Sequence, residues 1–290
     1  MSKKLIHNTP QRIFTFGCSF TGYQWGTWAN ILGVEFPEAE FRNFGRSGAG
    51  NQYIHNMIMQ ADNVYNFTHE DLVIVQWTNV CREDRYLPEK DGWLVPGNIF
   101  SQGDYNQNFI ENYFSEFGSY VRDFALIKSA HQLLKHRCNH HMIKMLDFEY
   151  SNQWDLKPNP DLNLQTLTHM YEESIGQILP SFYATLWNNN LEAKLAKDKK
   201  IVHKLFHDGH PTPLEHYDYL KTVFKHDWSD KTDKVVGATQ KKWVKLMTSA
   251  CLGQPGQGFS LYEMKQRWLD MLKYETIMRP NTQINPLIRQ

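Results

Sequence analysis

The sequence predicts an α/β fold with a parallel sheet, because strand-like and helix-like segments alternate through residues 1–150. The four strand candidates are Arg12 to Phe16, Glu40 to Phe44, Asp71 to Trp77 and His141 to Phe148. The third contains the continuous apolar run Leu72-Val73-Ile74-Val75. Such a run is typical of a strand buried on both faces of a parallel sheet. Right-handed crossovers through the intervening helices are therefore expected.

Helical patterns lie between these strands, at Tyr23 to Leu32, Asn51 to Tyr65 and Phe109 to Arg137. In the longest, Phe117, Phe124 and Ile127 recur at helical spacing, which places them on one buried face. Further helices are expected at Leu164 to Leu179, at Leu186 to Lys197 and from Pro213 onward. We interpret residues 1–226 as one α/β domain with insertions near 85–108 and 150–200.

Residues 227–290 form a helical C-terminal extension in this interpretation. Two amphipathic helices, Lys234 to Ala250 and Leu261 to Ile277, follow a polar break and are separated by a Gly/Pro/Gln linker. Three roles stay open from the sequence: an oligomerisation hairpin, a cover over the active site, or a docking element. Pairing of these helices between subunits would make a homo-oligomer.

The composition predicts a globular protein with neither nucleic acid nor membrane as a partner. Apolar residues make up 41% of the 290, and 31 Lys and Arg balance 31 Asp and Glu. No apolar run is long enough to span a membrane, and the four cysteines form no CxxC pair. Together with an N-terminus that lacks an apolar signal region, this predicts a cytoplasmic protein. The 13 histidines show no metal-ligand spacing, so no metal or other cofactor is expected.

The first chemically informative stretch is Gly17-Cys18-Ser19-Phe20, which ends the first strand. In open α/β sheets, the carboxyl edge of the strands is where ligands and catalytic groups collect. Ser19 is therefore a candidate nucleophile, although a serine that caps the following helix would give the same pattern. Cys18 is expected to pack internally, because adjacent side chains of an extended backbone point to opposite sides.

Two further stretches follow the next strands. The block Asn43 to Asn51 carries three glycines ahead of a helix, so its backbone amides can face a ligand unless it is only a flexible turn. Asn79 ends the buried third strand and offers two N–H donors suited to an oxyanion, or else simply forms a turn. Arg82 follows at the same edge and is a candidate for binding an anionic part of a substrate, unless it belongs to a surface ion-pair cluster.

The fourth stretch, His207 to His216, places an acid and histidines in a turn held by two prolines. A general base needs such a fixed position and a partner for its ring, which makes His210 the candidate base and Asp208 its partner. Ordinary surface turn chemistry is the alternative for this loop. For His216 we expect a histidine on a helix face that packs beneath the loop.

Taken in order, the four stretches resemble the motif blocks of the SGNH (GDSL-like) hydrolase and O-acyltransferase superfamily. The resemblance implies a flavodoxin-like, three-layer α/β sandwich with a parallel sheet and a catalytic serine. Ser19 matches the nucleophile, Gly48 and Asn79 match the oxyanion hole, and His210 matches the base. The family often has a second histidine six residues after the base, as His216 is here.

Three positions depart from the family pattern. Trp77 and Val80 replace the Gly and Asp of the third block, and Cys18 replaces the Asp beside the nucleophile. Asp208 lies two residues before His210 instead of three, which changes where its carboxylate points. Asp208 then either orients the imidazole or leaves a Ser-His dyad. Similar sugar O-acyltransferases tolerate this shortened spacing.

The resemblance implies a serine esterase-type hydrolase that removes an O-acyl group through an acyl-enzyme. Acetyl on a carbohydrate is the expected substrate type, since Trp93, Tyr105 and Trp154 lie in segments where aromatic rings would stack on sugars. An O-acyltransferase acting on a sugar acceptor is an alternative of the same chemistry. A non-catalytic binding or assembly protein that retains the fold is the other alternative.

Overall fold

The computed structural model describes residues 3–6, 8–90, 92–100, 105–151, 155, 159, 161–201 and 209–251. A four-stranded parallel sheet lies at its centre in the order β3-β2-β4-β7. Its strands are β2 (Arg12–Phe16), β3 (Glu40–Asn43), β4 (Asp71–Trp77) and β7 (Asn139–Lys144). The predicted α/β fold with a parallel sheet is confirmed.

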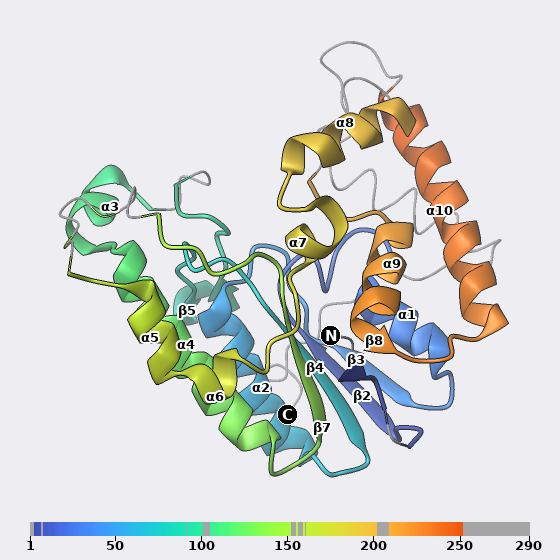
Figure 1. Ribbon diagram of the computed structural model, residues 1–290, viewed down its shortest axis with the longest axis horizontal. Helices are drawn as coiled ribbons and strands as arrows, with labels where there is room; N and C mark the ends of the chain where they lie inside the picture. The colour runs from blue at the N-terminus through green and yellow to red at the C-terminus, as the bar shows by residue number, and fades with distance from the viewer. Residues whose placement is uncertain are drawn as a thin grey trace.

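The helices flank this sheet on both sides (Figure 1). The long ones are α1 (Trp28–Glu35), α2 (Asn51–Tyr65), α4 (Glu116–Leu134), α9 (Pro213–Val223) and α10 (Asp230–Cys251). In Figure 1, α2 and α4 lie on one side of the strands, and α1, α9 and α10 lie on the other. The pairs that pack directly are α2 with α4, α9 with α10, and α1 with both α9 and α10.

Shorter elements lie in residues 85–113 and 164–201 and at the margins of the sheet. They are α3 (Gln107–Tyr113), α5 (Leu164–Met170), α6 (Glu172–Ile175), α7 (Phe182–Trp187), α8 (Leu191–Ile201), the antiparallel pair β5 (Arg85–Leu87) and β6 (Gly92–Leu94), a 3-10 turn at Pro88–Lys90, and the parallel pair β1 (Lys3–Lys4) and β8 (Phe224–Lys225).

Apolar strand sequences account for the register of the sheet. Every residue of β4 is buried, as the continuous apolar run requires of a central strand. At its amino end, Asp71 accepts two hydrogen bonds of 2.7 Å from the guanidinium of Arg12 on β2. This paired geometry aligns the starts of β2 and β4, and β4 runs two residues beyond Phe16, the end of β2.

Several helix boundaries differ from the sequence expectation. The helix predicted at Tyr23 to Leu32 begins only at Trp28, and the one predicted at Phe109 to Arg137 is two helices, α3 and α4. The break has a local cause, since Ser115 accepts a hydrogen bond from Gly118 N and caps a new helix. The second C-terminal helix, Leu261 to Ile277, lies outside the described residues.

Candidate active site

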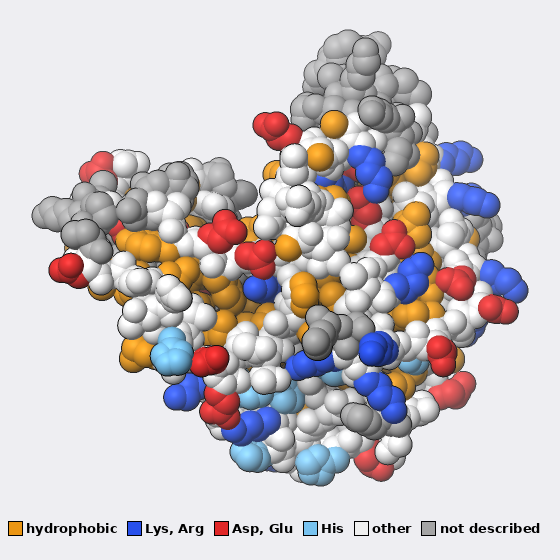
Figure 2. Space-filling model, viewed as in Figure 1, with side chains coloured by type: hydrophobic (Ala, Val, Ile, Leu, Met, Phe, Trp, Pro, Cys, Tyr) orange, Lys and Arg blue, Asp and Glu red, His pale blue; other side chains and the backbone are white. Residues whose placement is uncertain are grey.

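The carboxyl ends of the strands face a hollow between two parts of the molecule, one with α3 and one with α7 and α8 (Figures 1 and 2). Figure 2 shows apolar side chains gathered on the side of this hollow where α4 and α5 lie. Ser19, Gly48 and Asn79 each follow one strand of the sheet, so the topology brings the three turns to a common edge.

Ser19 sits in a tight turn that follows β2. The carbonyl of Cys18 accepts hydrogen bonds from Thr21 N (2.9 Å) and Gly22 N (3.0 Å), which close the turn around Ser19. The turn begins at Gly17, where there is no room for a side chain because a Cβ would lie 2.1 Å from Thr21 Oγ1. The Ser19 side chain is buried, with 6% of its surface exposed. The turn therefore holds Ser19 at the sheet edge in a fixed position.

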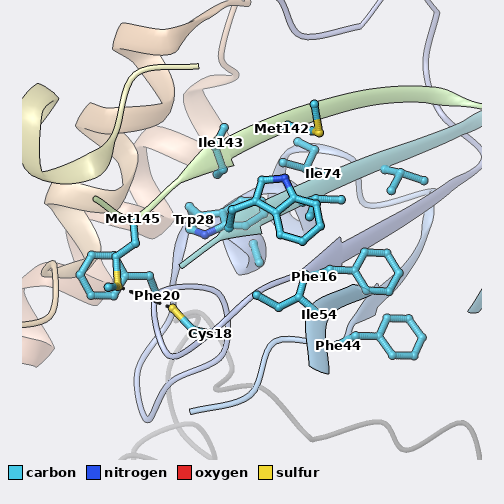
Figure 3. Close-up of a cluster of buried hydrophobic side chains, with 14 of the residues drawn as sticks. Phe16, Cys18, Phe20, Trp28, Phe44, Ile54, Ile74, Met142, Ile143 and Met145 are labelled. Atoms are coloured by element: carbon cyan, nitrogen blue, oxygen red, sulfur yellow. Dashed lines mark hydrogen bonds between the residues drawn. The ribbon is translucent and has the colours of Figure 1, made fainter. Parts of the chain in front are cut away.

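Cys18 points into the core beneath this turn, as predicted from the sequence. It is fully buried, with its Sγ 3.7 Å from Gln76 Oε1 and 3.8 Å from Met145 Sδ (Figure 3). The same Gln76 oxygen accepts a 2.7 Å hydrogen bond from Thr21 Oγ1. The thiol is thus a packing group that helps to tie the Ser19 turn to β4.

The glycine-rich block is bonded directly to the Ser19 turn. Arg46 N donates to the Gly17 carbonyl at 3.0 Å, and Asn43 Nδ2 donates to the Thr21 carbonyl at 2.9 Å. Asn43 Oδ1 in turn accepts from Gly45 N at 2.9 Å. These bonds fix the distance between the two turns, which is the requirement for amides on both to act on one oxygen atom.

Gly48 adopts a backbone conformation that favours glycine, with φ at +82°. A Cβ at this position would lie 2.4 Å from the carbonyl oxygen of Val95, and Gly97 N donates to the Gly48 carbonyl at 3.0 Å. In the described part of the chain, the backbone amides of Ser19 and Gly48 donate no hydrogen bond. Unbonded amides of this kind suit a negatively charged oxygen.

The Asn79 side chain is held by its oxygen, which accepts a 2.6 Å hydrogen bond from Cys81 N. Its amide nitrogen donates to no group among the described residues. The residue before it, Thr78, exchanges two hydrogen bonds with Asn51: Thr78 N donates to Oδ1 at 2.8 Å, and Nδ2 donates to the Thr78 carbonyl at 3.1 Å. The half-buried Asn79 thus presents an oriented donor at the end of β4.

Arg82 contacts the glycine-rich block through a 2.7 Å hydrogen bond from Nη1 to the Ala49 carbonyl. The guanidinium thereby supports the turn that carries Gly48. Its expected contact with an anionic substrate stays a prediction.

Asp84 lies at the same edge, and the sequence pattern does not mark it as a residue of the candidate site. It is buried at the N-terminus of α2, where its carboxylate accepts from Gly50 N and Tyr53 N, both at 2.9 Å. Burial raises its pKa to about 6, and these two N–H groups and Arg82 partly offset the effect. In the sequence it looked like part of a charged surface cluster, and no sequence pattern marks it as buried.

Buried charge behind the site holds the segment after Asn79 in place. Arg122 on α4 donates from Nη2 to the Arg82 carbonyl at 3.1 Å, pairs with Glu83, and bonds Asp123 Oδ1 at 2.7 Å. Burial raises the pKa of Asp123 to about 6, although Arg122 and Asn51 stabilise its charged form. This network anchors segment 79–84, which also contacts the glycine-rich turn through Arg82 and Asp84.

His210 reaches this edge from a distant part of the sequence. Its half-buried ring stacks on Tyr23, with centroids 3.9 Å apart and planes at 16°, and its centroid lies 5.4 Å from that of Phe20. His210 therefore lies against the turn that carries Ser19. Within the described residues, no hydrogen bond joins the imidazole to Ser19 Oγ. Asp208, the predicted partner of the imidazole, lies outside the described residues.

His216 packs beneath the loop, as predicted. It is fully buried between Phe20 and Phe182, with ring centroids at 6.3 and 5.6 Å, and its Nδ1 has no hydrogen-bond partner. Burial, with smaller contributions from His210 and Lys194, lowers its pKa well below the usual value for histidine. A neutral, enclosed ring of this kind supports the loop from within the core.

Two other features bear on the chemistry. Among residues 3–251 with the gaps given above, no three His, Cys, Asp or Glu side chains are grouped so as to hold a metal ion. None of the helices that the structure describes is long and apolar enough to cross a membrane.

No protein-family model matches the sequence, and no curated protein matches it. Among solved structures, the chain is similar to a member of the lipolytic protein G-D-S-L family from Veillonella parvula. The match has 18% identity and a TM-score of 0.38, and covers 72% of this chain and 96% of that one.

The chain is also similar to protein YXIM from Bacillus subtilis, with 12% identity and a TM-score of 0.36 over 82% of this chain and 56% of that one. A third similar structure is the C-terminal catalytic domain of Streptococcus pneumoniae peptidoglycan O-acetyltransferase A. It has 14% identity and a TM-score of 0.29 over 82% of this chain and 96% of that one. Because all three TM-scores are this low, these similarities assign no function to the chain, and its chemistry follows from the residues of the candidate site.

Proposed function

We propose that this chain is an SGNH-type serine acyl hydrolase with the three-layer sandwich of that superfamily. The supporting observation is the bonded arrangement of the two turns: Arg46 and Asn43 connect the glycine-rich block to the Ser19 turn, and the His210 ring packs against that same turn. The Ser19 hydroxyl, the His210 imidazole and two unbonded backbone amides thus lie at one edge of the sheet, which supports the roles proposed for them.

In the proposed reaction, Ser19 Oγ attacks the carbonyl carbon of an ester and its proton passes to His210. The backbone amides of Ser19 and Gly48, with the Asn79 side chain, stabilise the oxyanion that forms. His210 then protonates the departing alcohol, which leaves an acyl group on Ser19. Water attacks this ester, again with His210 as base, and releases the acid. The hydrogen bond between the imidazole and Ser19 Oγ forms in the substrate complex, since catalytic hydrogen bonds are often long or poorly aligned without ligand.

The proposed substrate is a small O-acyl ester, with acetyl on a carbohydrate as the first class to examine. Trp93 gives this choice little support, because it is buried between Tyr53 and Tyr86. Tyr105 is partly buried and its hydroxyl donates to the Glu83 carbonyl. Trp154 lies outside the described residues. The carbohydrate part of the proposal therefore depends on Tyr105, which keeps part of its surface exposed.

Hydrolysis of p-nitrophenyl acetate tests the proposal through Ser19→Ala. We expect turnover to fall to the uncatalysed level, and a fluorophosphonate probe to label the wild type but neither Ser19→Ala nor His210→Ala. Ser129→Ala is the matched control, since Ser129 Oγ lies 3.2 Å from His55 Nε2 but sits on an exposed helix surface without turn amides. Equal rates in wild type and Ser19→Ala would exclude Ser19 as the nucleophile.

The second candidate is an O-acyltransferase, in which a sugar hydroxyl replaces water in the second step. Adding sugar acceptors to the acyl-enzyme separates the two, because a transferase would form acylated sugar faster than free acid. A folded wild type that neither hydrolyses esters nor reacts with the fluorophosphonate would support the non-catalytic alternative.

A further inference from the structure

Four aromatic rings form a continuous column from α10 to the candidate base. Trp243 on α10 contacts Trp25 edge to face, with centroids 5.8 Å apart. Trp25 contacts Tyr23 edge to face at 4.5 Å, and Tyr23 stacks on His210 at 3.9 Å. We propose that this aromatic column fixes the imidazole of His210, with Tyr23 and Trp25 as positioning residues and α10 as the support behind them. The proposal rests on the proposed function, in which His210 is the base.

Trp25 also holds, by a hydrogen bond, the backbone of the turn that carries the candidate base His210, here called the base turn. Its Nε1 donates to the carbonyl of Pro211, the residue after His210, at 3.0 Å. Trp25 is buried, with 1% of its surface exposed, so this bond is shielded from water. A buried indole N–H needs a partner, and the carbonyl it takes is adjacent to the base.

Parallel stacking restrains the imidazole in a way that suits a base. Rotation of the His210 ring out of its plane would collide with Tyr23, because the two planes lie at only 16°. The ring nitrogens lie in the plane of the imidazole, so a partner stacked on its face does not occupy the directions of their hydrogen bonds. Tyr23 thus restricts the rotation of the imidazole without forming a hydrogen bond to its ring nitrogens through the stacked face.

The end of the base turn depends on the same helix. Leu214 N, at the start of α9, donates to Gln240 Oε1 on α10 at 3.1 Å. Thr212 N donates to Glu215 Oε2 at 2.9 Å and Glu215 N donates to Thr212 Oγ1, which closes a capping box around the turn. These contacts give α10 a role beyond the three left open from the sequence, as a brace for the turn that carries the candidate base.

Trp25→Phe tests the brace, with Trp28→Phe as its matched control. Both variants replace a fully buried indole by a phenyl ring, but Trp28 Nε1 makes no hydrogen bond while Trp25 Nε1 holds Pro211. We expect Trp25→Phe to lower kcat for ester hydrolysis roughly 10- to 100-fold with little change in KM, as small misplacements of a catalytic group do. Trp28→Phe should keep kcat within about 3-fold of the wild type.

A second readout does not depend on activity. NMR signals of the His210 imidazole should shift or broaden in Trp25→Phe and stay as in the wild type in Trp28→Phe. Unchanged signals and equal kcat in both variants would overturn the brace. A wild type that lacks ester hydrolysis, together with a His210 signal that responds to Trp25→Phe, would reject the proposed function and keep the brace.

Gln240→Ala gives a milder test if Trp25→Phe does not fold. It removes only the acceptor of Leu214 N, and Lys241→Ala on the exposed face of the same helix is its control. We expect Gln240→Ala to reduce kcat and to broaden the His210 signals, and Lys241→Ala to do neither. No difference between the two variants would contradict the role of α10.

Discussion

Gly48 shows how strictly a single residue is constrained at this site. Its φ of +82° costs any other L-residue about 1–2 kcal/mol, and a Cβ would also press on Val95 O at 2.4 Å. We predict that Gly48→Ala lowers the free energy of unfolding by at least about 2 kcal/mol and abolishes ester turnover. Urea unfolding and p-nitrophenyl acetate hydrolysis measure the two effects.

The control for this change is Gly237→Ala in the middle of α10, where a Cβ would meet nothing within 4 Å. Alanine is favoured over glycine in a helix, so this variant should be more stable by about 0.5–1 kcal/mol and equally active. Gly48→Ala with wild-type stability and activity would show that the turn relaxes at no cost and that the amide of Gly48 is not required.

Asp84 gives a prediction about pH at the same scale. Its pKa is about 6 in the folded chain because it is buried, whereas an unfolded aspartate titrates near 3.9. The folded state thus holds this proton more tightly, and the resulting stabilisation is complete below about pH 4 and is lost as pH rises through 6. Between these values, Asp84 should reduce the free energy of unfolding by roughly 2–3 kcal/mol.

Asp84→Asn should therefore flatten the dependence of stability on pH between 4 and 6, measured by urea unfolding at several pH values. Asp123, whose burial also raises its pKa to about 6, contributes a change of the same sign. The slope of the free energy of unfolding against pH should consequently become smaller in Asp84→Asn and in Asp123→Asn, but it should not reach zero in either variant. Identical slopes in wild type and both variants would contradict the charged, buried state of these residues.

The junction between β4 and α2 is the element-scale connection on which the Asn79 donor depends. Asn51, the first residue of α2, exchanges two hydrogen bonds with Thr78 and gives a third, of 2.7 Å, to Asp123 on α4. One buried side chain thus joins a strand and two helices. It fixes the end of β4 immediately before Asn79.

Asn51→Ala should lower the free energy of unfolding by about 2–3 kcal/mol, because Thr78 N and Asp123 each lose a buried partner. We also expect kcat to fall, since the Asn79 donor would lose its fixed position. Gln52→Ala, one residue along the same helix, has no such bonds and should change neither quantity beyond experimental error. Chemical denaturation and ester hydrolysis of the two variants provide the comparison.

Most of the strands were predictable from sequence because their signal is local, whereas β7 spans Asn139–Lys144 and not the predicted His141 to Phe148. The boundaries of β2 and β4 agree with the prediction, since their apolar residues are enclosed by the sheet itself. The start of α1 was not predictable. Tyr23 and Trp25 read as helical, but their side chains contact His210 and Pro211, which lie far along the chain. A tertiary contact of that kind has no local sequence pattern.

The site itself was predictable only in part for a similar reason. Glycines such as Gly48 mark turns whatever lies around them, so the glycine-rich block could be found from sequence. Asp84 could not, because a charged residue among other charged residues usually lies on the surface. Its burial depends on segment 79–84 folding back onto the N-terminus of α2, where Gly50 and Tyr53 offer N–H groups to its carboxylate.

At the scale of the whole molecule, the candidate site is assembled from segments that the sheet and α10 bring together. The turns after β2, β3 and β4 share the carboxyl edge of the sheet. The turn that carries His210, which precedes α9, is held from the other side by Tyr23 and Trp25 and by α10. Global unfolding should therefore disrupt the candidate site and expose the buried side chains at the same time. The reactivity of the buried cysteines measures this exposure.

Cys18, Cys81 and Cys138 are buried in the described structure, with 0%, 5% and 6% of their surface exposed. Burial raises the pKa of Cys81 to about 12 and raises that of Cys138 as well, so little reactive thiolate forms at these two sites near neutral pH. We predict that iodoacetamide modifies these three thiols in the native chain only at the rate of unfolding. Peptide mapping by mass spectrometry along a urea series measures this.

The same experiment decides between the hydroxyl and the thiol as the reactive group beside the sheet edge. Because Cys18 Sγ points toward Gln76 and Met145, alkylation of the native chain should leave fluorophosphonate labelling of Ser19 unchanged. Cys18→Ala should retain the labelling as well, after any loss of stability is allowed for. Rapid alkylation of Cys18 with parallel loss of ester hydrolysis would instead identify the thiol as the nucleophile, because an enclosed packing group cannot react before the fold opens.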